Sequence, residues 1–243
     1  MRFSLIVPVR TSPLPMLGTT LDSAKSQKEV ELEIIVVAYR LNQQMRDLID
    51  RYENVQLIES EDQRLDAMLK QGIDAAMCDY VHILRPGELY LSFYALQIMT
   101  EYIAESDHPD VVVCGTMAKG EAYFNQISYQ NLRKGWHPLS GQNFWFKKAL
   151  LDEYDGGYKY LGFFDFLCRT VEAKKRISYF RRVLTDSYRF KTRWTNGLEE
   201  GQEMLRILTH YFGPGAALKW WLTVNQKDFF TSIGQRFKKA FLP

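Results

Sequence analysis

The chain has 243 residues, of which 46% are hydrophobic and 25% are charged, and its formal net charge is +2. This is the composition of an ordinary globular protein, and so small a net charge gives no argument for a nucleic-acid partner. The length suits one large α/β domain better than two small ones.

Three widely spaced cysteines, Cys78, Cys114 and Cys168, show no metal-ligand spacing. They predict reduced thiols in a cytosolic protein rather than a disulfide framework. The apolar run in the first ten residues is too short for a signal peptide, and no stretch is long enough to cross a bilayer. We therefore expect a cytoplasmic protein, with attachment to the inner face of the cell membrane left open.

Strands and helices alternate over the first third of the chain. Apolar and β-branched runs predict four buried strands, at residues 3–9, 32–37, 55–58 and 80–84. Helical spacing fills the intervals, at residues 16–27, 43–52 and 65–76. This order predicts an α/β fold with a mostly parallel sheet, wound right-handedly and flanked by helices.

The fourth strand belongs to the segment DYVHILRPGE, residues 79–88. Pro86 and Gly87 force a turn, which leaves the carboxylate of Glu88 just beyond the strand. Ligands of open α/β sheets bind in the crevice beyond the carboxyl ends of the strands. A carboxylate there can hold a divalent cation that bridges to the phosphates of a nucleotide. An ordinary surface turn with a solvated Glu88 is the alternative.

Several of these segments resemble glycosyltransferase family 2, the inverting group with the GT-A fold. FSLIVPVR at residues 3–10 resembles the opening strand of the family, and LEIIVVAYR at residues 32–40 stands where the family has an Ile-Ile-Val-Val-Asp-Asp-Gly-Ser type segment. Residues 59–88 resemble the run that ends in the metal-binding Asp-x-Asp region. The resemblance extends to about Arg189. It implies a GT-A-like, Rossmann-type sheet and a nucleoside-diphosphate sugar as donor, with UDP as the expected nucleotide.

The sequence also departs from the family pattern. Ala38 stands where the family has an Asp that reads the base or ribose, and Arg85 replaces the first polar residue of the metal motif. Glu88 is then the only carboxylate left to hold Mg²⁺ or Mn²⁺, together with phosphates and waters. Arg64 and Arg85 could neutralise the diphosphate, because a guanidinium matches phosphate oxygens bidentately. Solvated surface arginines are the alternative.

The predicted donor site lies at the strand ends and in the loops that follow them. Its residues are Pro8, Val9, Arg40, Glu61, Arg64 and Arg85.

The second half of the chain carries the predicted acceptor site. Residues 119–134 lack a clear period and are typical of an excursion over the mouth of the site. Residues 136–154 then resemble the part of the family in which a polar strand approaches the sugar. His137, Gln142 and Trp145 are the acceptor candidates, because sugar hydroxyls need polar partners and apolar sugar faces stack on aromatic rings. A structural histidine and a core tryptophan are the alternatives.

Residues 157–175 resemble the segment that carries the catalytic base. An inverting transferase needs a carboxylate to take the proton from the attacking acceptor hydroxyl. Asp165 is the only carboxylate at this position of the motif, although it matches the second acidic position and Phe163 occupies the usual base position. A structural role for Asp165 at the helix N-terminus is the alternative.

The C-terminal part adds basic and aromatic residues. Residues 176–189 resemble the closing strand of the family, and the cations in residues 188–194 suit a diphosphate or an anionic acceptor. We divide the chain into a GT-A-like domain at residues 1–195 and a helical extension at residues 196–243. Apolar residues recur every fourth position in the tail, at Phe229, Ile233, Phe237 and Phe241. This pattern indicates either a helix in a membrane interface or a helix docked on protein.

The resemblance implies transfer of a sugar, with inversion, to a saccharide or lipid-linked saccharide acceptor in polysaccharide or lipopolysaccharide synthesis. The competing hypothesis is a catalytically inactive pseudo-glycosyltransferase that acts as a binding or assembly subunit. Ala38, Arg85 and Phe163 favour it, since each replaces a group that the chemistry uses. A nucleotidyltransferase is a weaker hypothesis. It would need a glycine-rich loop with a lysine after the first strand, and that loop contains one glycine.

Overall fold

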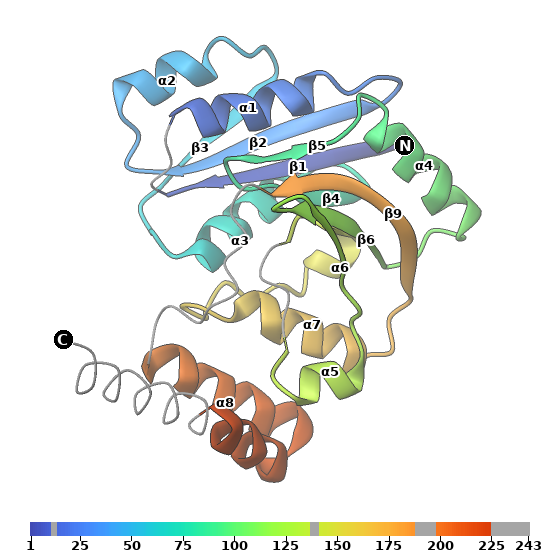
Figure 1. Cartoon of the computed structure of the whole chain (residues 1–243). Helices are drawn as coiled ribbons and strands as arrows, with labels where there is room; N and C mark the ends of the chain where they lie inside the picture. The colour runs from blue at the N-terminus through green and yellow to red at the C-terminus, as the bar shows by residue number, and fades with distance from the viewer. Residues whose placement is uncertain (11–13, 137–140, 188–197, 225–243) are drawn as a thin grey trace, which may run out of the picture.

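The structure is a computed structural model that describes residues 1–10, 14–136, 141–187 and 198–224. In the described part, nine strands form one sheet with helices on both faces (Figure 1). The elements in chain order are β1 (Arg2–Val9), α1 (Leu14–Lys25), β2 (Glu31–Tyr39), α2 (Gln43–Ile49), β3 (Val55–Ser60), α3 (Leu65–Ala75), β4 (Tyr80–Ile83), β5 (Glu88–Tyr90), α4 (Ala95–Glu105), β6 (Val111–Ala118), β7 (Glu121–Phe124), α5 (Tyr129–Arg133), β8 (Phe144–Lys147), α6 (Lys148–Leu151), α7 (Gly162–Glu172), β9 (Ile177–Ser187) and α8 (Leu198–Phe212).

The first half of the chain forms a parallel sheet in the order β3-β2-β1-β4. Its strands are the four predicted from apolar runs, and helices α1, α2 and α3 connect them. β1 is buried from Phe3 to Val9, as a parallel strand covered on both faces must be. The predicted α/β alternation is confirmed here.

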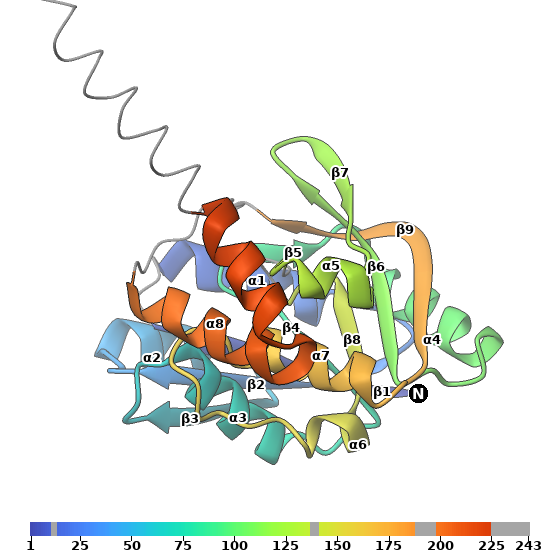
Figure 2. The same cartoon turned by 90° about the horizontal axis from the view of Figure 1, so that it is seen from below.

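The second half of the sheet is mixed. β8 runs antiparallel to both β4 and β6, β6 runs parallel to β9, and β5 runs antiparallel to β9. The expectation of a mostly parallel sheet therefore describes the first half better than the second. A short apolar run such as that of β8 carries no information about strand direction, so only the tertiary structure decides it. Residues 119–134 form β7 and α5, and Figure 2 shows the hairpin of β6 and β7 extending from the body of the molecule.

Two apolar cores lie on the two faces of the sheet, because successive side chains of a strand point to opposite faces. In β1, Ile6 belongs to the core that includes residues of α3, α7 and α8, whereas Leu5 and Val7 belong to the core that includes residues of α1 and α4. In β8, Phe144 and Phe146 belong to the first core and Trp145 to the second. Figure 1 shows the two groups of helices above and below the sheet.

The described part of the predicted C-terminal extension joins the first core. The spacing of apolar residues predicts an amphipathic helix over residues 198–212; α8 has these bounds, and it buries Met204, Ile207 and Leu208. After Gly213 a second helix spans residues 214–224 and buries Trp220 in the same core. The repeated aromatic positions from Phe229 onward lie outside the described residues. In the described part, no helix is long and apolar enough to span a membrane.

Candidate functional site: the carboxyl edge of the parallel strands

The carboxyl ends of four parallel strands lie side by side and define the candidate site. Tyr39 at the end of β2 pairs with Ser60 at the end of β3, and Ile83 at the end of β4 pairs with Ile6 of β1. Because the strands are parallel and adjacent, the residues that follow them share one edge of the sheet. Ligands of open α/β sheets bind at this edge.

The segment that ends β4 is a tight turn. The amide of Glu88 donates to the carbonyl of Arg85 at 2.8 Å, so Pro86 and Gly87 occupy the central positions. Gly87 has φ +93°, which a type II turn requires at its third position, and proline favours the second. Thr20 of α1 fixes the turn, because its hydroxyl accepts from the amide of Gly87 at 2.9 Å and donates to the carbonyl of Glu88 at 2.8 Å. The sequence predicted this turn correctly.

The turn directs the carboxylate of Glu88 back onto Arg85. Oε2 accepts from the backbone amide of Arg85 at 2.8 Å, while Oε1 accepts from Nε at 3.0 Å and from Nη2 at 2.9 Å. The side chain of Glu88 is 3% exposed and that of Arg85 is 35% exposed. The pair therefore presents a cation to the crevice and keeps the anion beneath it.

This geometry corrects the assignment of Glu88 as a metal ligand. A divalent cation needs carboxylate oxygens that face it, and both oxygens of Glu88 already accept hydrogen bonds from Arg85 in a buried position. Within the described ranges, no group of three His, Cys, Asp or Glu side chains is arranged to hold a metal ion. The residues at this edge do not fit the Mg²⁺ or Mn²⁺ that the resemblance implies.

A second anchored arginine follows β3. Arg64 is the residue before α3, and its Nε and Nη2 lie 2.8 and 2.6 Å from Oδ2 of Asp62. Its Nη1 donates to the carbonyl of Gly157 at 3.2 Å, which ties the edge to the loop before α7. Glu61, another predicted donor residue, is exposed beside this pair.

The remaining predicted donor residues end β1 and β2. Pro8 and Val9 are buried in the sheet, so they can offer backbone atoms but no side-chain contact to a ligand at the edge. Arg40 is exposed and follows β2 with φ 54°, in the left-handed region that non-glycine residues rarely adopt. Its guanidinium carbon lies 5.1 Å from the centre of the Tyr39 ring.

Two predicted acceptor residues, Trp145 of β8 and Gln142 in the turn before it, lie in the interior. Trp145 is fully buried and stacks on His82 with ring centres 4.0 Å apart, so its assignment as a sugar-stacking ring is wrong for this structure. Gln142 is 1% exposed and its side chain donates to Thr116 at 2.6 Å, which corrects its assignment as an acceptor contact. His137 lies outside the described residues.

His82 joins β4 to the mixed half of the sheet. Its Nε2 lies 2.8 Å from the carbonyl of Gln142, so Nε2 carries the proton, and Nδ1 accepts from the hydroxyl of Tyr90 at 2.8 Å. Burial lowers the pKa of His82 to about 3. The ring is therefore a neutral structural bridge rather than an acid or a base at neutral pH.

Asp165 lies in the first turn of α7, and its carboxylate is buried and engaged by neighbouring side chains. It is 4% exposed, its Oδ2 accepts from Nη2 of Arg169 at 2.8 Å, and its Oδ1 accepts from the hydroxyl of Tyr158 at 3.3 Å. Phe163, at the usual base position of the family, packs edge-on against Phe144 with ring centres 5.5 Å apart. Asp165 is thus held in an ion pair with Arg169, and its role as the catalytic base stays a prediction.

Asp165 and Glu88 are held by helices that pack on different faces of the sheet. α7 packs in the core beneath the sheet, whereas the turn that carries Glu88 is bonded to α1 on the opposite face (Figure 1). The joint action of these two carboxylates on donor and acceptor stays a prediction.

A buried carboxylate that the sequence did not single out connects the edge to α7. Asp66, in the first turn of α3, accepts from the amide of Gly162 at 3.0 Å and from the hydroxyl of Tyr154. Burial raises the pKa of Asp66, and these hydrogen bonds oppose the rise. Its sequence signal was weak, because an acidic residue in a first helical turn is ordinary.

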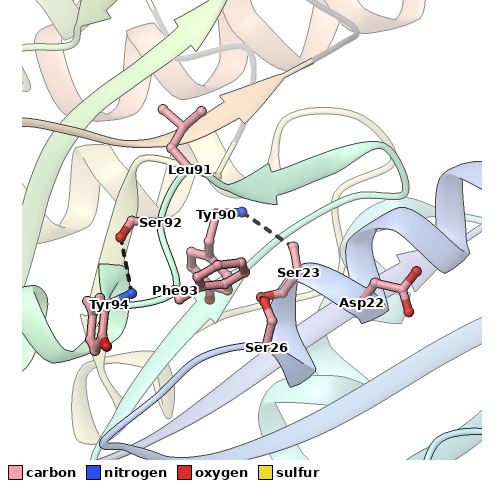
Figure 3. A pocket seen from close by; sticks show the side chains of 8 residues that line it. All are labelled: Asp22, Ser23, Ser26, Tyr90, Leu91, Ser92, Phe93 and Tyr94. Atoms are coloured by element: carbon pink, nitrogen blue, oxygen red, sulfur yellow. Dashed lines mark hydrogen bonds between the residues drawn. The ribbon is translucent and has the colours of Figure 1, made fainter.

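An open cavity of about 550 Å³ lies apart from this edge (Figure 3). It is formed by the C-terminal half of α1 and the segment from β5 to α4, and its lining residues are Asp22, Ser23, Ser26, Tyr90, Leu91, Ser92, Phe93 and Tyr94. Because α1 runs back toward the amino ends of the strands, this cavity is away from the crevice where ligands of such sheets bind. Its lining includes a carboxylate and no cation, which does not suit a diphosphate.

Solved structures share this architecture, although no family model and no curated protein matches the chain. TarS of S. aureus, a GT-A-type glycosyltransferase, matches with a TM-score of 0.69 and 16% identity over 86% of this chain and 39% of TarS. A complex of residues 1–349 of TarS with UDP matches with a TM-score of 0.69 and 16% identity over 87% of this chain and 65% of that one. A complex of the same residues with UDP-GlcNAc matches with a TM-score of 0.70 and 16% identity over 87% of this chain and 66% of that one. The chain thus spans about two fifths of the full TarS chain. It has the GT-A-like fold of these structures.

Proposed function

We propose that the chain is a glycosyltransferase that takes a sugar from a nucleoside-diphosphate sugar, with UDP as the nucleotide. The observation that carries this proposal is the GT-A-like fold with exposed and half-exposed guanidinium groups at the carboxyl edge of its parallel strands. The crystal structures of TarS with UDP and with UDP-GlcNAc support the same class of donor.

The acceptor is a saccharide or a lipid-linked saccharide in the synthesis of a polysaccharide or lipopolysaccharide. An acceptor hydroxyl attacks the anomeric carbon in line with the departing diphosphate, and this inverts the configuration at that carbon. Negative charge grows on the diphosphate as the bond breaks, and fixed cations there stabilise the transition state more than the ground state. This is the chemical use of Arg64 and Arg85.

A membrane surface is the proposed place of action, because lipid-linked acceptors are held there. The helix at residues 214–224 supports this, since Leu218, Trp221 and Leu222 are 57%, 47% and 46% exposed and lie on one side of it. An exposed apolar face of this kind is typical of an interaction surface.

A second candidate is a nucleotide-sugar-binding subunit without transferase activity. The structure favours it at one point: the segment expected to carry the base has Asp165 locked to Arg169 and Phe163 packed in aromatic contacts. In this case the donor site would bind but not turn over its ligand.

Calorimetry followed by a release assay separates the two. The full chain is titrated with UDP, UDP-GlcNAc and GDP-mannose, and UDP or GDP release is then measured with saccharide and lipid-linked acceptors and without an acceptor. Micromolar binding of a nucleotide with acceptor-dependent release supports the transferase. Binding of the same strength without release under any condition supports the subunit, and absence of nucleotide binding by a folded protein overturns both.

A further inference from the structure

Each of the four adjacent parallel strands is followed by an arginine. They are Arg10 directly after β1, Arg40 directly after β2, Arg64 four residues after the end of β3 and Arg85 two residues after the end of β4. We propose that these guanidinium groups take the place of a divalent cation at the diphosphate, so that this chain binds its donor without metal. The proposal rests on the proposed function, because it names what holds the donor at that same site.

The sheet brings the four positions to one edge. β1 lies between β2 and β4, and β3 flanks β2 on the outer side. Neighbouring strands are about 4.8 Å apart, so the arginines follow a row about three strand spacings long. Extended guanidinium side chains reach several ångströms, and a diphosphate can therefore meet more than one of them.

Arg85 is prepared for an anion by its pairing with Glu88. The carboxylate engages Nε and Nη2 from below, and Arg85 Nη1 has no hydrogen-bond acceptor among the described residues. The guanidinium is half-exposed while the carboxylate is buried. A guanidinium fixed in this way loses less side-chain entropy on binding than a free one, which favours affinity.

Arg64 is held by Asp62 through Nε and Nη2, and its Nη1 also donates to the carbonyl of Gly157, so it is more fully engaged than Arg85. The carboxylate accepts from the backbone amide of Arg64 at 2.8 Å as well as from its guanidinium, so backbone and side chain are fixed together. Glu88 and Asp62 are therefore positioning residues that act through their arginines.

Arg10 and Arg40 supply the uncompensated charge. Both are exposed, and neither forms an ion pair with a residue of the described ranges, whereas Arg64 and Arg85 are balanced by carboxylates. Two unbalanced positive charges correspond to the charge of one divalent cation.

The test is calorimetric binding of UDP to the full chain, once with EDTA and once with Mn²⁺. We expect dissociation constants within twofold of each other and a strong decrease of affinity with salt concentration. Binding that appears only with Mn²⁺ overturns the arginine proposal and leaves the proposed function standing. Absence of UDP binding under both conditions overturns the proposed function and this proposal together.

Variants locate the effect. Arg85→Lys keeps the charge but loses the two-nitrogen grip, and we expect UDP affinity to fall about tenfold, which corresponds to about 1.4 kcal/mol. We expect the UDP affinity of Arg10→Gln to fall by a similar factor. Arg206→Gln, an exposed arginine of α8 in the other core layer, is the matched control and should not change affinity. Thermal unfolding confirms that each variant folds, and unchanged affinity of Arg85→Lys and Arg10→Gln contradicts the proposal.

Glu88→Gln gives a further readout. The side chain keeps its shape but loses the charge that orients Arg85, so affinity for UDP should fall in EDTA and should not recover when Mn²⁺ is added. If Glu88 were a metal ligand, the unsubstituted protein would bind UDP more tightly with Mn²⁺ than with EDTA, and Glu88→Gln would abolish that difference. Such a dependence would overturn the proposal.

Discussion

Asp66 of α3 caps the N-terminus of α7, since its Oδ2 accepts from the backbone amide of Gly162 at 3.0 Å. A Cβ on Gly162 would lie 2.7 Å from Cγ of Asp66, so the contact needs glycine at that position. Tyr154 donates to the other carboxylate oxygen. The interaction joins α3, which begins at the candidate donor edge, to α7.

Asp66→Ala is expected to lower the free energy of unfolding by about 2–4 kcal/mol, because it leaves the Gly162 amide and the Tyr154 hydroxyl buried without their acceptor. Asp66→Asn keeps an acceptor and should lose less. Urea unfolding of both variants measures the difference. Equal losses would show that the hydrogen bonds are not what Asp66 contributes.

The same carboxylate predicts a pH dependence. Burial raises the pKa of Asp66 above its usual 3.8, so the folded state binds the proton more tightly than the unfolded state. Its contribution to stability is full below pH 3.8 and declines as the pH rises through the folded pKa. The difference in unfolding free energy between the unsubstituted protein and Asp66→Asn should therefore shrink from pH 3.5 to pH 7. A difference that grows over this range contradicts the assignment.

His82 predicts an opposite trend. Its pKa falls from 6.5 to about 3 on burial, so the folded state excludes a proton that the unfolded state binds. Stability from the neutral ring is full above pH 6.5 and is lost as the pH falls toward 3. Between pH 7 and pH 5 the loss attributable to His82 is about 2 kcal/mol. His82→Gln should flatten this part of the stability profile, whereas the exposed His108→Asn should leave it unchanged.

Arg40→Gly separates structure from binding. Glycine adopts φ 54° without strain, while the variant loses the contact of the guanidinium with the Tyr39 ring. These effects oppose each other, so the melting temperature should change by only a few degrees. UDP affinity should nevertheless fall by about tenfold if Arg40 meets the diphosphate. Unchanged affinity would remove Arg40 from the donor site.

Asp165→Asn tests whether that residue is a structural ion-pair partner or the catalytic base. The change removes the charge that pairs with Arg169 in the interface of α7 and α8, and we expect a loss of about 1–3 kcal/mol in unfolding free energy. UDP affinity should remain within twofold. If acceptor-dependent release of UDP falls more than a hundredfold while stability is unchanged, Asp165 is the catalytic base.

The exposed face of the last described helix predicts membrane contact. The full chain should float with vesicles of phosphatidylglycerol and phosphatidylethanolamine in a density gradient. Trp221→Ser combined with Leu222→Ser should reduce flotation, because it removes apolar surface without touching the buried Trp220. Equal flotation of this variant and the unsubstituted chain would contradict a role for this face.

The sequence by itself determined the α/β alternation, the four parallel strands, the turn at Pro86 and Gly87 and the extent of α8, because each depends on local periodicity or on residues with restricted backbone angles. It also placed Arg40, Arg64 and Arg85 at strand ends. Side-chain direction was beyond its reach: Trp145 and Gln142 were expected to face a sugar, and both lie inside the sheet.

Only the tertiary structure decided the roles of the carboxylates. Glu88 is buried in an ion pair with Arg85, and Asp165 is buried in an ion pair with Arg169. Asp66 became important through a contact with Gly162, 96 residues away. A carboxylate has the same covalent structure as a metal ligand, a base or an anchor for a guanidinium. Its role depends on which groups the fold brings within about 3 Å of its oxygens, and those groups come from distant parts of the chain.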